Sequence, residues 1–178
     1  MVEPQGLVQV YTGEGKGKTT AAFGLALRAA GQGLKVCIIQ FMKSAEKETG
    51  EFKAVHGLSG IEILRFGGSF VFPEADPKAR EGARKSCQEA LSLAREKSSQ
   101  EDLDVLILDE INVALSFGFI DLNEVLKLIF ERPPNLEMVL TGRGAPQELI
   151  EAADLVTEMR MVKHPFQKEV VARRGIEY

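Results

Sequence analysis

The sequence has little that would tie the protein to a membrane, a disulfide framework or a structural metal. Its 178 residues include two cysteines, Cys37 and Cys87, which form no CxxC pair, so neither a disulfide framework nor a zinc site is expected. Apolar runs such as Val105–Leu108 are far shorter than the roughly 20 residues that span a bilayer. The first residues lack the cationic and apolar regions of a signal peptide. We therefore expect a cytoplasmic protein with reduced cysteines and no membrane partner.

The net charge of the protein argues against nucleic acid as a partner. The formal net charge is −4 and the pI is about 5.4, so no global basic field attracts the protein to nucleic acid. Hydrophobic residues make up 44% and charged residues 27% of the chain, which is typical of a globular protein. The length favours a single domain over residues 1–178.

Short apolar runs alternate with helical patterns along the chain, which is the βαβ signature of a parallel sheet. This alternation predicts an α/β fold: a mostly parallel sheet with helices on both faces. The expected strands are Leu7–Tyr11, Lys35–Phe41, Ile61–Phe66, Asp104–Asp109, Leu136–Thr141 and Asp154–Met159. The expected helices are Lys18–Ala30, Pro77–Lys97, Leu122–Phe130 and Pro146–Ala153. Two long connections, Met42–Gly60 and Gly67–Pro77, are expected to be functional or mobile, and no element is assigned to Arg160–Tyr178.

The most informative segment runs from an apolar strand into a glycine-rich turn and directly into an Ala/Leu-rich helix. This order directs backbone N–H groups and the positive end of the helix dipole at one point. Lys18 would supply a charge for the outer phosphates, and Thr19 a hydroxyl for Mg²⁺. We expect the triphosphate of ATP to be bound by Gly13, Glu14, Gly15, Lys16, Gly17, Lys18, Thr19 and Thr20. The alternative is a flexible turn with a solvated lysine, and Thr12 stands where the usual motif has its first glycine.

A second acidic signal lies at the end of a buried-strand pattern, in DVLILDE. In α/β sheets ligands gather at the carboxyl ends of strands. Asp109 or Glu110 could therefore hold Mg²⁺ beside Thr19, directly or through water. The spacing does not distinguish between the two carboxylates, and either one could instead cap the following helix.

These segments together resemble a known family. The runs TGEGKGKTTAAFGLALRAAG, LILDEI, LTGRGAP and ADLVTEMRMVKHPFQKEVVARRGIEY are similar to those of the P-loop ATP:corrinoid adenosyltransferases, over nearly the whole chain. Thr12 belongs to that family's variant of the phosphate loop. The resemblance implies a single-domain P-loop NTPase-like (RecA-like) fold. It also implies a homodimeric enzyme that transfers the 5′-deoxyadenosyl group of ATP to the Co(I) of a corrinoid and releases inorganic triphosphate.

The resemblance also implies roles for individual residues. Lys18 would act on the leaving triphosphate. Phe70 and Phe72 match the aromatic pair that faces the corrinoid and excludes its lower axial ligand, although both could simply pack in the core. Arg28 and Arg143 lie in matching motifs and are expected at the nucleotide, although a structural salt bridge is an equal alternative for Arg143. Mg²⁺, with Mn²⁺ as an alternative, is the expected cofactor, and a reduced flavodoxin is the expected electron donor. No acid–base role is assigned to His164.

Three other functions compete with adenosyl transfer. A small RecA-like ATPase would use Glu110 to orient a hydrolytic water, but no arginine-finger motif is evident. A small-molecule kinase lacks an arginine-rich lid segment. A non-catalytic nucleotide sensor is disfavoured because Lys18, Thr19 and Asp109 are all present.

Overall fold

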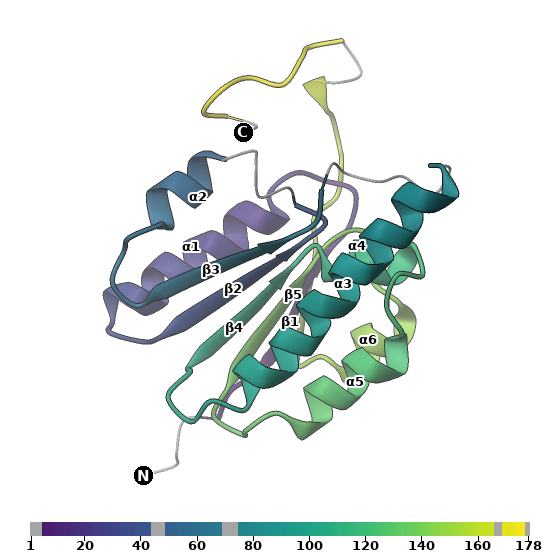
Figure 1. Ribbon diagram of the computed structural model, residues 1–178. Coiled ribbons are helices and arrows are strands. Elements are labelled where there is room, and N and C mark those ends of the chain that lie inside the picture. Colours follow the sequence, from purple (N-terminus) through teal and green to yellow (C-terminus); the bar gives the residue numbers. More distant parts are fainter. Residues whose placement is uncertain (1–4, 44–48, 69–74, 166–168, 177–178) are drawn as a thin grey trace.

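The chain folds around one parallel sheet (Figure 1). In the computed structural model, which describes residues 5–43, 49–68, 75–165 and 169–176, six strands are ordered β3-β2-β4-β5-β1-β6. They are β1 (Val8–Thr12), β2 (Val36–Phe41), β3 (Ile61–Phe66), β4 (Val105–Asp109), β5 (Glu137–Thr141) and β6 (Leu155–Glu158). The predicted strands and the α/β class are confirmed, because every strand begins and ends within one residue of its predicted bounds.

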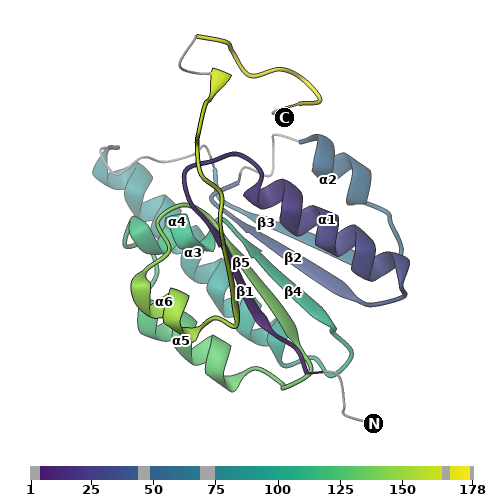
Figure 2. The same cartoon turned by 180° about the vertical axis from the view of Figure 1, so that it is seen from behind.

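Helices cover both faces of this sheet, as predicted. They are α1 (Lys18–Gly31), α2 (Gly50–Val55), α3 (Pro77–Ser98), α4 (Ile111–Ser116), α5 (Leu122–Glu131) and α6 (Gln147–Ala152). Helices α1 and α2 lie on one face and α3 to α6 on the other (Figures 1 and 2). Within the described ranges, no helix is both long and apolar enough to cross a bilayer.

The sequence reading missed α2 and α4. Each is six residues long, which is too short for a helical period to repeat. Helix α2 lies inside the long connection after β2 and is capped by Thr49, whose hydroxyl accepts a hydrogen bond from Phe52 N–H at 3.4 Å. Helix α4 begins directly after Glu110, at the end of β4.

Two neighbouring interior strands, β2 and β4, show why the sheet is stable. Every residue of β2 and β4 is buried, as expected for parallel strands covered on both faces. Small residues of α1, such as Ala22 and Ala26, pack closely against Ile38 and Ile107. Each isoleucine side chain that is removed from water in this way contributes about 1.5–3 kcal/mol to folding.

The strand order positions the phosphate loop. The chain leaves β1, crosses β5 and β4 by way of α1, and returns as β2. In the sheet, β5 and β4 lie between β1 and β2. The first turn of α1 therefore lies over the carboxyl ends of β5 and β4. After β6 the chain continues above the same edge of the sheet, where the C-terminal segment lies near α2 (Figures 1 and 2). Loop, acidic strand end and C-terminal segment thus meet at one edge.

Candidate functional site

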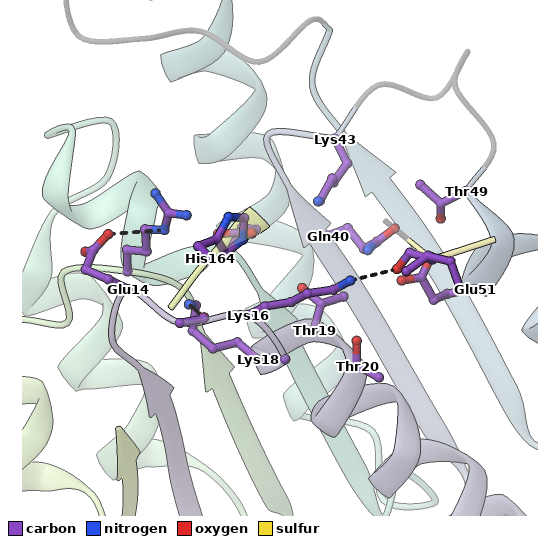
Figure 3. Close-up of a pocket in the computed structure, with 15 residues that line it drawn as sticks. Glu14, Lys16, Lys18, Thr19, Thr20, Gln40, Lys43, Thr49, Glu51 and His164 are labelled. Atoms are coloured by element: carbon purple, nitrogen blue, oxygen red, sulfur yellow. Dashed lines mark hydrogen bonds and ion pairs between the residues drawn. The ribbon is translucent and has the colours of Figure 1, made fainter. Parts of the chain in front are cut away.

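A cavity of about 360 Å³ opens at the carboxyl edge of the sheet. Its walls come from the phosphate loop, the end of β2, the start of α2, the end of β4 and the C-terminal segment (Figure 3). The structure brings together most of the predicted site residues here: Glu14, Gly15, Lys16, Gly17, Lys18, Thr19, Thr20, Glu110 and Arg143 line the cavity. Its composition is polar and charged, as a triphosphate site requires.

Lys18 lies at the centre of the loop and is 8% exposed. Its Nζ donates hydrogen bonds to the carbonyl oxygens of Gly13 and Gly15, the second at 2.8 Å. Burial lowers the pKa of this ammonium, and the Glu110 carboxylate partly opposes that shift. The charge is thus held inside the loop, where a phosphate can reach it without a large rearrangement.

Met159, which follows β6, forms backbone hydrogen bonds with the glycine-rich loop. Gly15 N–H donates to the Met159 carbonyl at 2.6 Å, and Met159 N–H donates to the Thr12 carbonyl at 2.9 Å. A Cβ on Gly13 would lie 2.5 Å from the Met159 oxygen, and one on Gly15 would lie 2.7 Å from it. Two of the loop glycines are therefore required by this backbone packing, in addition to any close approach of phosphate.

Thr12 has a structural task in this variant loop. It is 8% exposed, and its hydroxyl accepts a hydrogen bond from Ala145 N–H at 3.3 Å. The bond links the start of the phosphate loop to the segment that follows β5 and carries Arg143. A glycine here would leave the Ala145 amide without this acceptor.

Asp109 is the centre of a buried hydrogen-bond network and is 0% exposed. Its Oδ1 accepts from the hydroxyls of Thr19 at 2.9 Å and Thr141 at 2.7 Å. Its Oδ2 accepts from Gln40 Nε2 at 2.9 Å. Because Thr19 donates its proton to Asp109, the lone pairs of its hydroxyl oxygen are directed away from the carboxylate and would be available to a metal ion.

Glu110 is held differently from Asp109. It adopts a left-handed backbone conformation with φ 65°, which is uncommon for a residue with a side chain and is concentrated at functional sites. Its N–H donates to Thr141 Oγ1 at 3.1 Å. Burial, and secondly the neighbouring Asp109, raise the pKa of the Glu110 carboxyl. The turn directs Glu110 into the cavity, whereas Asp109 remains bonded within the protein.

Arg143 joins this cavity to a second one. Its Nε lies 3.5 Å from Glu14 Oε2, and both side chains are 63% exposed, so the ion pair adds little stability. The adjacent hollow has a volume of about 590 Å³ and shares Glu14, Glu110 and Arg143 with the first. Its other walls include Val113 and Phe117. Arg143 therefore forms an exposed ion pair with Glu14 and lines both hollows, and its expected contact with the nucleotide stays a prediction.

Among the described residues, three predicted site residues do not line the cavity: Gly13, Asp109 and Arg28. Gly13 and Asp109 still adjoin it, through their hydrogen bonds to Lys18 and Thr19. Arg28 lies in the last turn of α1 and lines a separate hollow at the amino ends of the strands, with Asp104 and Glu137. Arg28 lies ten residues beyond Lys18 in this helix, which is a distance of about 15 Å, so Arg28 is remote from the loop, and its expected contact with the nucleotide stays a prediction. Phe70 and Phe72 lie outside the described residues.

Sequence reasoning missed part of the cavity wall. The additional lining residues are Gln40, Lys43, Thr49, Glu51, His164 and Ile176. A weak signal existed for Gln40, which is the one polar residue in the strand VCIIQF. The others come from a long connection and from the C-terminal segment, where no periodic pattern indicates which residues face the loop.

The oxygen donors at the cavity fit a hard cation bound together with phosphate. In the described part of the chain, no group of three or more His, Cys, Asp or Glu residues could hold a metal ion without help. Thr19 and Glu110 line the cavity, and Asp109 orients Thr19. Mg²⁺ is commonly bound by one or two protein carboxylates plus substrate phosphates, so the donor set fits Mg²⁺ delivered with ATP.

Comparison with known proteins agrees with this geometry. The family described as "ATP:corrinoid adenosyltransferase BtuR/CobO/CobP" matches residues 4–178. A corrinoid adenosyltransferase of Sinorhizobium sp. is 38% identical, over 99% of this chain and 82% of the relative. The corrinoid adenosyltransferase of Escherichia coli K12 is 37% identical, over 99% of this chain and 87% of the relative. Corrinoid adenosyltransferase CobA of Salmonella typhimurium is 34% identical over the same shares.

Proposed function

Because the chain belongs to the ATP:corrinoid adenosyltransferase family, we propose that its two adjoining cavities hold the two substrates of adenosyl transfer. The protein is a transferase of cobalamin biosynthesis that moves the adenosyl group of ATP to a corrinoid. The smaller cavity takes the triphosphate, and the adjacent hollow faces the corrinoid. A small RecA-like ATPase is not favoured.

One observation carries this assignment of substrates to cavities. The two hollows share Glu14, Glu110 and Arg143, so a ligand in one lies directly beside a ligand in the other. The first is lined largely by charged and hydroxyl groups, whereas the second includes the apolar side chains of Val113 and Phe117. A triphosphate suits the first environment, and a large macrocycle with an apolar face suits the second.

The reaction requires stabilisation of a leaving group and no general base. Co(I) supplies an electron pair to C5′ of the ribose, the C5′–O bond breaks, and its electrons remain on the triphosphate oxygen. Lys18 lines the smaller cavity at the start of α1, so its ammonium and the first backbone amides of the helix would stabilise this negative charge. Mg²⁺, held by Thr19 and the acidic end of β4, would neutralise further charge on the phosphates.

The acceptor side of the proposal rests on the family resemblance. Phe70 and Phe72 would form an apolar wall that offers the cobalt no lower ligand, which makes Co(II) easier to reduce because axial ligation tunes metal potentials. Arg143 would bind the edge of one of the substrates. A reduced flavodoxin would supply the electron.

We further propose that residues 1–178 form one catalytic domain that works as a homodimer in the cytoplasm. The edge strand β6 supports the dimer, because all four of its residues are exposed. They include Leu155 at 41% and Val156 at 40%. Sedimentation analysis tests this directly, and a monomer at working concentration contradicts it.

The products test the proposed reaction. Incubation with ATP, Mg²⁺ and chemically reduced cobalamin is expected to yield a light-sensitive alkylcobalamin and intact inorganic triphosphate in equal amounts. Absorbance before and after illumination detects the first product, and anion-exchange chromatography the second. Release of ADP and phosphate without alkylcobalamin would refute adenosyl transfer.

A further inference from the structure

Gln40 is a buried polar residue in an otherwise apolar strand. It lies near the carboxyl end of β2, where it is the register partner of Asp109 on β4. Its exposed fraction is 3%, and its neighbours Ile39 and Phe41 are both 0% exposed. Gln40 nevertheless lines the proposed triphosphate cavity (Figure 3). A polar side chain in this position contacts both the network of Asp109 and the space where ligand binds.

The orientation of the Gln40 amide is determined by its neighbour. Nε2 donates to Asp109 Oδ2 at 2.9 Å. The reverse orientation would place the amide oxygen against a carboxylate oxygen, where two acceptors repel each other. Oε1 must therefore be directed away from Asp109.

That oxygen is buried and has no hydrogen-bond partner among the residues that the structure describes. An acceptor that has lost water and gained no donor destabilises the fold. Within the described ranges, Asn112 and Arg132 also carry a buried atom without a partner, but neither residue lines this cavity. The position of Gln40 therefore indicates that the missing donor comes from a ligand.

We propose that Gln40 is a positioning residue for the metal ion that accompanies ATP. Its Oε1 accepts a hydrogen bond from a water molecule bound to Mg²⁺, while its Nε2 holds Asp109 so that Asp109 keeps the Thr19 hydroxyl oriented. Mg²⁺ gives up its waters reluctantly and usually keeps several of them, so a metal-bound water would supply the donor that Oε1 lacks. The inference rests on the metal-assisted ATP binding proposed above.

The test measures metal binding separately from catalysis. Gln40→Met keeps a side chain of similar length but cannot accept this hydrogen bond. Mn²⁺ is titrated into the protein–ATP complex and free Mn²⁺ is followed by electron paramagnetic resonance. We expect the dissociation constant for Mn²⁺ to rise by about tenfold, the usual effect of losing an outer-shell partner. ATP affinity without metal stays unchanged.

Thr141→Val is the matched control, because Thr141 also donates to Asp109 and is buried but does not line the cavity. We expect it to weaken Mn²⁺ binding by less than Gln40→Met does. Equal weakening by the two variants, or unchanged Mn²⁺ affinity in Gln40→Met, would overturn the proposal. A parallel loss of metal-free ATP affinity would also overturn it, since this indicates lost packing.

Two further measurements keep the result interpretable. If Gln40→Met does not fold, Gln40→Asn is used instead, because its side chain is one methylene shorter and moves the amide oxygen away from the cavity. Unchanged Mn²⁺ affinity in that variant overturns the proposal. Adenosyl transfer by the wild type is measured separately from triphosphate release. A wild type that binds Mn²⁺ with ATP but transfers no adenosyl group refutes the proposed reaction, while the Gln40 comparison still decides the metal role.

Discussion

Helix α1 has a hollow at each end, and the two hollows differ in whether their polar groups already have hydrogen-bond partners within the protein. At its start, the cavity beside Lys18 is lined by Gln40, whose buried amide oxygen has no partner in the described part of the chain, and by Glu110, whose carboxyl pKa is raised by burial. At its end, the hollow beside Arg28 is somewhat larger, about 430 Å³ against about 360 Å³. Its acids are already bonded: Glu137 accepts from Leu7 N–H and Gln9, and Asp104 accepts from Lys35 N–H.

The comparison teaches that size does not identify the site. Concave regions occur wherever loops leave the end of a sheet, but a binding site needs polar groups that are left for the ligand. The carboxyl edge also has the converging amides of a helix start, whereas the opposite hollow meets a helix end, where carbonyl oxygens repel a phosphate.

The largest expected effect is on turnover, when a basic residue is removed from one end of α1 or from the other. Lys18→Ala should lower kcat/KM for ATP by at least about 100-fold, because it removes a charge that stabilises the leaving triphosphate. Arg28→Ala should leave kcat/KM within about twofold of the wild type, since Arg28 lies at the other end of the helix. Steady-state formation of alkylcobalamin measures both. Near wild-type turnover in Lys18→Ala, or a large loss in Arg28→Ala, would contradict the comparison.

A second pair of variants tests the packing of the loop. Gly15→Ala places a Cβ 2.7 Å from the Met159 oxygen, and such overpacking should cost about 1–3 kcal/mol of unfolding free energy. Gly24→Ala is the control, because Gly24 lies within α1 and its added Cβ would meet no described heavy atom within 4 Å beyond the adjoining helix backbone. It should stabilise the protein by about 0.5–1 kcal/mol. Urea denaturation measures both, and equal effects would refute the proposed role of Met159.

A third pair examines the acceptor side. Phe72→Ala should slow the reaction that starts from Co(II) and a mild reductant by about tenfold, or ~1.4 kcal/mol, and should affect preformed Co(I) much less. The reason is that an apolar wall acts on the reduction of cobalt and not on the alkyl transfer. Phe130→Ala, which changes an aromatic residue that is 71% exposed on α5, is the control. Equal losses in the two assays would indicate that Phe72 only packs.

The smallest effect is expected at the opposite end of the sheet. Glu137→Gln removes a charge but keeps one carbonyl oxygen that can accept from Leu7 N–H, so unfolding free energy should fall by no more than about 1 kcal/mol. Turnover should not change. Thermal unfolding and the alkylcobalamin assay measure the two quantities. A drop in turnover at unchanged stability would show that this end also takes part in the reaction.

Local signals predicted much of the fold. Apolar β-branched runs placed all six strands to within a residue, and the glycine-rich turn placed the start of α1 at Lys18. Helices α2 and α4 were missed because six residues give a period no room to repeat. The same limit applies to the site, since Lys43, Thr49, Glu51 and His164 lie on connections and in the C-terminal segment.

The phosphate loop shows where sequence and structure divide. The sequence alone determined that a triphosphate is expected at Gly13 to Thr20, because a strand, a glycine-rich turn and a helix are contiguous along the chain. Only the tertiary structure decided that Met159 requires two of these glycines, that Asp109 holds Thr19 and Gln40, and that Arg28 is remote. Those relations join residues that are distant in the chain, and the order of the strands brings them together or separates them.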